Sequence, residues 1–72
     1  MNQINVYINA EYSFSYEDTV IPRKGDSVTL SGIYGKDYET VGGRYYVKEV
    51  EFELYGGLDI SRRINVYLRE LE

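Results

Sequence analysis

The 72-residue sequence contains no cysteine and no histidine, and it has a single proline. Without cysteine the chain forms no disulfide and offers no thiolate ligand to zinc. Without histidine it lacks the commonest metal ligand and the commonest general base of enzymes. No catalytic sequence motif offsets these absences. We therefore expect no metal site, no cofactor and no enzymatic activity.

Basic residues are also few, since eight Lys and Arg stand against twelve Asp and Glu and give a net charge of −4. Proteins that bind nucleic acids or membrane surfaces usually carry a basic patch, so both kinds of partner are disfavoured. No basic stretch followed by an apolar run opens the chain, and no stretch approaches the roughly 18 apolar residues of a membrane span. The expected location is the cytoplasm.

Tyrosine is abundant, with nine tyrosines among residues that are 43% hydrophobic and 28% charged. Such a composition is typical of a globular domain, and aromatic rings suit strands and supply apolar area. Residues 1–72 are expected to form a single domain, close to the lower size limit for a chain stabilised by its core alone. Packing has to supply the stability, and self-association is one way to add to it.

Residues 4–16 alternate between apolar even positions and mostly polar odd positions. The even positions are Ile4, Val6, Ile8, Ala10, Tyr12, Phe14 and Tyr16. Because successive side chains of a strand point to opposite faces, the even positions are predicted to face the core. This segment is longer than the usual strand of about 5–6 residues. The pattern leaves open whether it forms one bent strand or two strands.

Pro22 lacks a backbone N–H and therefore marks a strand end or a sheet edge. Gly25, three residues later, indicates a tight turn in which the glycine has a positive φ angle. A strand is predicted over residues 27–31. Residues 32–43 contain four of the seven glycines and are predicted to form a loop.

Residues 44–55 are predicted to form a long strand in which glutamates alternate with apolar residues. Val50, Phe52 and Leu54 lie on one face, and Glu49, Glu51 and Glu53 lie on the other. A β-bulge near Lys48 would bring Val47 onto the same face as Val50 and bend the strand.

The last strand is predicted over residues 63–71, paired antiparallel with the long strand. The register that sets Leu54 opposite Ile64 also sets Glu49 opposite Arg69, and we favour it for this charge pair. A register shifted by two residues buries the core nearly as well. No segment shows the 3.6-residue period of an amphipathic helix. The predicted fold is all-β: five to six antiparallel strands curled into a small barrel or a strongly bent sheet.

Residues 22–28, Pro-Arg-Lys-Gly-Asp-Ser-Val, resemble a segment of the SH3-like β-barrels, in which a Gly-Asp-x-Val step opens a strand. A long bent strand and a final hairpin strand follow there, and residues 44–55 and 63–71 correspond to them. The resemblance implies an SH3-like barrel over most of the chain. It does not place the aromatic pair that reads proline-rich peptides, so that activity is not inferred.

Five tyrosines are candidate partner-binding residues. Tyr7, Tyr67 and Tyr55 occupy outward strand positions, and Tyr34 and Tyr38 lie in the glycine-rich segment. Exposed aromatic residues are enriched at interfaces, although tyrosines on one sheet face also simply pack together. If the first and last strands are neighbours, Tyr7 and Tyr67 form one patch.

The row Glu49, Glu51 and Glu53 is a further candidate, for a cation or a basic partner. Carboxylates two residues apart on a strand are roughly 6.5–7 Å apart, which is too far to share an ion easily. A solvated outer face that deters edge-to-edge aggregation is therefore the favoured interpretation.

We interpret the chain as a small non-enzymatic protein-interaction or scaffolding module whose partner is another protein or a second copy. The alternative is a nucleic-acid-binding barrel in which tyrosines stack on bases. That alternative requires Arg23, Lys24, Arg62 and Arg63 to cluster in space.

Overall fold

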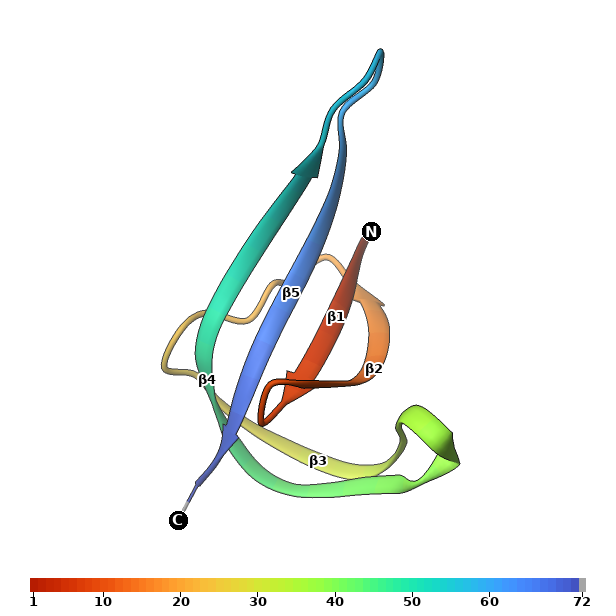
Figure 1. Ribbon diagram of the computed structural model, residues 1–72. Coiled ribbons are helices and arrows are strands. Elements are labelled where there is room, and N and C mark those ends of the chain that lie inside the picture. Colours follow the sequence, from red (N-terminus) through yellow and green to blue (C-terminus); the bar gives the residue numbers. More distant parts are fainter. Residues whose placement is uncertain (72) are drawn as a thin grey trace.

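The computed structural model describes residues 1–71 and contains five strands and one short 3₁₀ helix (Figure 1). The elements are β1 (Asn2–Ile8), β2 (Glu11–Asp18), β3 (Ser27–Tyr34), η1 (Lys36–Tyr38), β4 (Thr40–Tyr55) and β5 (Ser61–Glu70). One sheet, in the order β2-β1-β5-β4-β3, curls into a half-barrel. The prediction of a small all-β domain built on a strongly bent sheet is confirmed.

The sheet is mixed, because β1 and β5 run parallel while the other three pairs are antiparallel. The expectation of a wholly antiparallel sheet is wrong at this one pair. In the parallel register Ile4 lies beside Ile64, and Val6 lies beside Val66. All four side chains are buried, so this pairing places the buried apolar residues of β1 and β5 together at the centre of the sheet.

The first segment forms two strands rather than one bent strand. Asn9 and Ala10 have positive φ angles of 52° and 70°, as the central residues of a type I′ hairpin turn require. An irregularity in the pairing sets Tyr7 opposite Tyr12 and leaves Ser13 as the extra residue on β2. This extra residue shifts the alternation of inward and outward side chains along β2 by one position, so Tyr12 is exposed. Ala10, in the preceding turn, is exposed as well. The predicted inward orientation of these two residues is wrong.

The turn predicted between Pro22 and Asp26 is confirmed. The amide of Asp26 donates to the carbonyl of Arg23 at 3.0 Å, and Gly25 has a φ of 93°. The amide of Gly25 then donates to the carbonyl of Val47 at 2.8 Å, and the amide of Val47 donates to the carbonyl of Asp26 at 2.9 Å. The turn therefore pairs with β4 where the latter strand bends.

The glycine-rich segment is mostly strand, so the loop predicted over residues 32–43 is wrong. Only residues 35–39, which include η1, connect β3 to β4. Gly32 has a φ of 66° and lies where the β3–β4 register shifts between Leu30 and Ile33. Glycine here permits an irregular strand rather than ending one.

The bulge predicted near Lys48 is confirmed, because the β4–β5 register shifts between Val47 and Glu49. The register favoured from the sequence is wrong by two residues, since Phe52 rather than Leu54 lies opposite Ile64. The two registers bury nearly the same core. The observed one sets Glu53 opposite Arg63 and is accompanied by hydrogen bonds across the outer face of the hairpin, which are described below.

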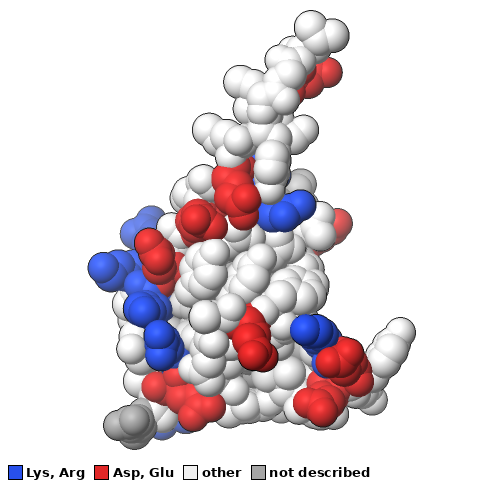
Figure 2. All heavy atoms as spheres, in the orientation of Figure 1, with Lys and Arg blue, Asp and Glu red and all other residues white. Residues whose placement is uncertain are grey.

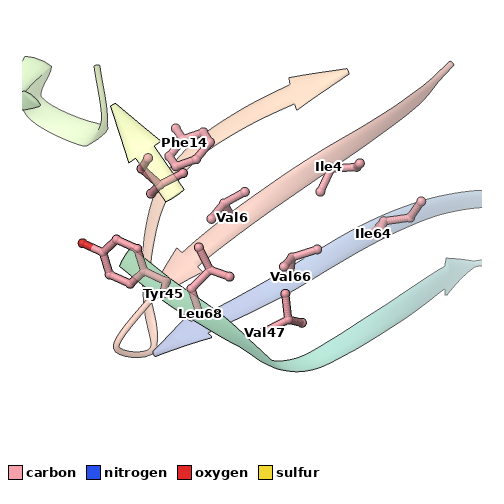
Figure 3. Close-up of a cluster of buried hydrophobic side chains, with 9 residues drawn as sticks. Ile4, Val6, Phe14, Tyr45, Val47, Ile64, Val66 and Leu68 are labelled. Atoms are coloured by element: carbon pink, nitrogen blue, oxygen red, sulfur yellow. The ribbon is translucent and has the colours of Figure 1, made fainter. Parts of the chain in front are cut away.

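The core lies on the concave side of the sheet, where the labelled side chains of Figure 3 point toward one another. It comprises Ile4, Val6, Phe14, Leu30, Tyr45, Val47, Ile64, Val66 and Leu68. The strands β1 and β5 supply more than half of it. No helix within residues 1–71 is long and apolar enough to cross a membrane.

The outer half of the β4–β5 hairpin extends beyond the rest of the sheet, as Figure 1 shows. The strand β1 pairs with β5 only from Ile64 onward, and β3 pairs with β4 only as far as Tyr46. Residues 52–62, which we call the arm, thus have no neighbouring strand within the described chain. The arm accounts for the elongated shape, with extents of 43, 27 and 22 Å.

Substitution of Val47 by alanine tests the bulge. Because the bulge turns Val47 into the core, where it is 1% exposed, Val47→Ala should lower the free energy of unfolding by about 2–3 kcal/mol. The exposed Val20 is the matched control, and Val20→Ala should stay within about 0.5 kcal/mol of the parent. Urea denaturation measures both, and equal losses in the two variants would contradict the placement of Val47.

Candidate functional site

The outward tyrosines of the central strands form one cluster. Tyr7 and Tyr67 are stacked, with ring centroids 4.9 Å apart and an interplanar angle of 24°. Tyr12 packs against Tyr7 at 5.8 Å and 75°. The parallel register places Tyr7 beside Tyr67, and the β1–β2 register places Tyr7 opposite Tyr12. The structure therefore unites two of the predicted tyrosines and adds Tyr12, which the sequence pattern had placed in the core.

Asn65 lies next to this cluster and is the one buried polar residue of the described chain, at 0% exposure. Its side-chain amide donates to Glu51 Oε1 at 2.9 Å and also to Glu53 Oε1. Its carbonyl oxygen accepts a hydrogen bond from Asn5 Nδ2 at 3.2 Å. Asn65 thus links the two central strands to β4 across the outer face. A buried polar group costs stability unless it is bonded in this way.

The hydrogen bonds continue from Asn5 onto β2. Ser15 Oγ donates to Asn5 Oδ1 at 2.7 Å, and the hydroxyls of Ser15 and Tyr12 are 2.8 Å apart. Four adjacent strands are therefore connected on their outer side by one line of polar side chains. That line explains why the polar face of a small sheet holds a defined shape.

The tyrosine hydroxyls on the β4 side are engaged with the glutamates. Tyr67 donates to Glu51 Oε1 at 2.9 Å, and partial burial together with this bond raises the pKa of Tyr67 to about 12. Tyr55 donates to Glu53 Oε2 at 2.8 Å, which lowers the pKa of Glu53 and raises that of Tyr55. Of the three glutamates that alternate along β4, Glu51 and Glu53 therefore accept hydrogen bonds within the fold. Within residues 1–71 no three acidic side chains are placed to hold a metal ion.

Some ring faces of these tyrosines are also occupied within the molecule. The stack covers one face of Tyr7 and one face of Tyr67, and the guanidinium of Arg63 lies 5.4 Å from the ring centroid of Tyr55. A base or another flat ligand would have to displace these contacts to reach the same faces. The geometry favours the interpretation in which outward tyrosines pack against one another.

Tyr34 and Tyr38 do not join the cluster. They are 72% and 88% exposed at the end of β3 and in η1, and neither ring packs against another aromatic ring within residues 1–71.

The four basic residues of the nucleic-acid alternative do not gather in one place. Arg62 and Arg63 border a shallow groove of about 450 Å³ beside Tyr7 and Tyr55. Lys24 instead lies near Lys48 at the bend of β4. Figure 2 shows acidic side chains between the basic group at one side of the molecule and the base of the arm. The clustering that this alternative requires is not found.

The arm carries a group of exposed apolar side chains. Phe52, Leu54 and Ile60 are 54%, 69% and 77% exposed, and Leu58 at the tip is fully exposed. The sequence placed Phe52 and Leu54 in the core. Both side chains point to the same side of β4 as the core residues, but the hairpin extends past the residues that would cover them. The prediction that they are buried is therefore wrong. Leu58 and Ile60 were missed, although two large apolar residues beside Gly56 and Gly57 are unusual for a turn.

A second uncovered apolar surface lies inside the half-barrel. Between β2 and β3 the concave side opens into a cleft of about 420 Å³, lined by apolar side chains that include Phe14, Tyr16, Ile33 and Tyr34. Gly35, which follows β3, approaches β2 so closely that a Cβ atom there would lie 3.2 Å from the carbonyl oxygen of Ser13. We call this opening the cleft.

These features define a five-stranded half-barrel with a polar, hydrogen-bonded outer face, an apolar arm and an apolar cleft. Comparison of the chain with protein-family models, with curated proteins and with solved structures finds no match.

Alkaline titration tests the bond between Tyr67 and Glu51. The pKa of Tyr67 is raised from 10.0 to about 12 in the folded state. The contribution of its protonated hydroxyl to the free energy of unfolding is therefore fully present below pH 10 and is lost as the pH rises toward 12. The stability advantage of the parent over Tyr67→Phe should therefore shrink across that interval in urea denaturation. Tyr38→Phe, in which an exposed hydroxyl is removed, is the matched control. Identical pH profiles for the two variants would contradict the assignment.

Proposed function

We propose that this protein is a non-enzymatic protein-interaction module and that the arm is its main contact surface. The observation that carries the proposal is the exposure of four large apolar side chains on one projecting hairpin. Single exposed apolar residues are normal on a folded protein, whereas a contiguous group marks a contact surface.

The composition of the arm favours a protein partner over a nucleic acid. Interfaces between proteins have an apolar or aromatic centre surrounded by polar and charged residues. The arm combines the exposed apolar residues Phe52 and Leu54 with few charged residues, namely Glu53, Asp59 and Arg62. Nucleic acids are bound mainly through cations, and the arm has one basic residue, Arg62, whose guanidinium already donates to Asn2.

The backbone of the arm offers a second means of attachment. The outer edges of β4 and β5 have no neighbouring strand there within residues 1–71. Such an edge pairs with an extended segment of another chain through main-chain hydrogen bonds, while alternate side chains supply specificity. A partner strand could therefore extend the arm as well as cover its apolar face.

The tyrosine cluster is the weaker candidate surface, because the hydroxyls of Tyr12 and Tyr67 and one face each of Tyr7 and Tyr67 are used within the fold. An SH3-like barrel remains our proposal for the fold family. The five strongly curled strands support it, and the parallel β1–β5 pair departs from the antiparallel barrel expected.

A photo-crosslinking amino acid placed at Leu58 tests the proposal in a lysate of the source cells. We expect adducts with another polypeptide chain, either a copy of this chain or a different protein. The same reagent at Tyr38, which is equally exposed but outside the arm, should give none. Adding Leu54→Asp should reduce the adduct at position 58 about tenfold, as loss of a central interface residue does. Equal labelling at both positions, or none at position 58, would contradict the proposal.

A further inference from the structure

The groove of about 450 Å³ at the base of the arm has a lining unlike that of the cleft. It lies mainly on the outer face of the sheet, and four strands contribute side chains to it, among them Asn5, Ser15, Tyr55 and Arg63. Among residues 1–71 the lining consists of three tyrosines, two arginines, two serines, one asparagine and one glutamine. Every side chain of the lining therefore carries a hydrogen-bonding group, and none is aliphatic.

Part of this lining is held in place by the fold itself. The side-chain amide of Asn5 donates to Asn65 Oδ1 at 3.2 Å, and its oxygen accepts a hydrogen bond from Ser15 Oγ at 2.7 Å. The ring of Tyr7 is held by its stack on Tyr67. Side chains that are already ordered lose little conformational freedom when a ligand binds, so this part of the groove is prepared for binding.

Other lining side chains keep their hydrogen-bonding groups free. Within residues 1–71 the side chains of Gln3, Tyr7 and Ser61 make no hydrogen bond, and the guanidinium of Arg63 contacts only the ring of Tyr55. An amide and a hydroxyl both donate and accept, whereas a guanidinium only donates. A ligand that meets all of these groups has to carry donors and acceptors at several points.

The charges around the groove are balanced. Arg62 and Arg63 line it, but two carboxylates stand directly beside the lining. Glu17 lies opposite Gln3 in the β1–β2 pair, and Glu53 lies opposite Arg63 in the β4–β5 pair. These carboxylates offset the two guanidinium groups, so the surroundings favour neither an anion nor a cation. The balance indicates a neutral ligand.

A carbohydrate combines these properties. Its hydroxyl groups each donate and accept, and the C–H groups on the face of a sugar ring pack against aromatic rings. The volume of the groove falls within the range of about 300–1,000 Å³ of sites that hold small organic molecules. We propose that the groove binds a neutral carbohydrate. Tyr7 and Tyr55 contact its C–H groups, and Gln3, Ser61 and Arg63 bond its hydroxyls.

This site goes beyond the proposed function, which concerns the exposed apolar side chains of the arm. Binding to an array of immobilised oligosaccharides tests it, with neutral, sialylated and sulfated glycans side by side. We expect the purified chain to bind at least one neutral glycan and to gain nothing from added sialic acid or sulfate, because the charges at the groove are balanced.

Substitutions in the groove should weaken the binding of that neutral glycan. Gln3→Ala and Arg63→Ala each remove hydrogen bonds to its hydroxyls, so each should raise the dissociation constant about five- to tenfold. Arg44→Ala, at an exposed position of β4 outside the groove, is the matched control and should bind as the parent does. Circular dichroism and urea midpoints verify that every variant is folded.

The location is tested by following backbone amide chemical shifts while the neutral glycan from the array is added. The predicted result is that the changes concentrate at Gln3, Asn5, Ser61 and Arg63. Changes confined to the β3–β4 connection or to the cleft would contradict the assignment.

Three outcomes overturn the inference. The chain binds no neutral glycan, it binds only sialylated or sulfated glycans, or the two groove variants bind as tightly as Arg44→Ala. None of these results depends on crosslinking from position 58. The carbohydrate site and the proposed function of the arm therefore fail separately.

Discussion

The parallel pairing of β1 with β5 is the contact on which the rest of the structure depends. It aligns Ile4 with Ile64 and Val6 with Val66 on the concave face, which forms the centre of the core. The same register aligns Asn5 with Asn65 and Tyr7 with Tyr67 on the convex face. One strand pair thus specifies a buried apolar face and a hydrogen-bonded polar face, and a slip of one residue would exchange the two.

The remaining strands extend from this pair and leave the barrel incomplete. The bulges at Ser13 and Lys48 bend β2 and β4, and the outer strands curl toward each other without pairing along their length. The consequence is a cleft where a closed barrel would have a filled interior. The hairpin that projects past the core is the other consequence, because β1 and β3 stop before the hairpin ends.

The sequence predicted those parts of the fold that depend on local pattern. The alternation of glutamate and apolar residues identified β4, and the out-of-phase Val47 revealed the bulge at Lys48. Tyr12 was misplaced because the bulge at Ser13 leaves no mark in the side-chain pattern. The register of the last hairpin was misjudged because Asn65 decides it through bonds to residues of another strand.

The candidate site was predicted less well than the fold. The pairing of Tyr7 with Tyr67 could be stated only conditionally, since nothing local reveals that residues sixty apart are neighbours in the sheet. Phe52 and Leu54 have the pattern of core residues, and only the lengths of neighbouring strands show that nothing covers them. Leu58 and Ile60, as apolar residues in a glycine-flanked turn, were the one direct sign in the sequence of an exposed apolar surface, and this sign was missed.

The parallel pairing of β1 with β5 is tested most directly by nuclear Overhauser effects between the two strands. Contacts between the side chains of Ile4 and Ile64, and between those of Ile8 and Leu68, are the predicted result. Contacts that set Ile4 beside Leu68 and Ile8 beside Ile64, as an antiparallel pair would, would contradict the account.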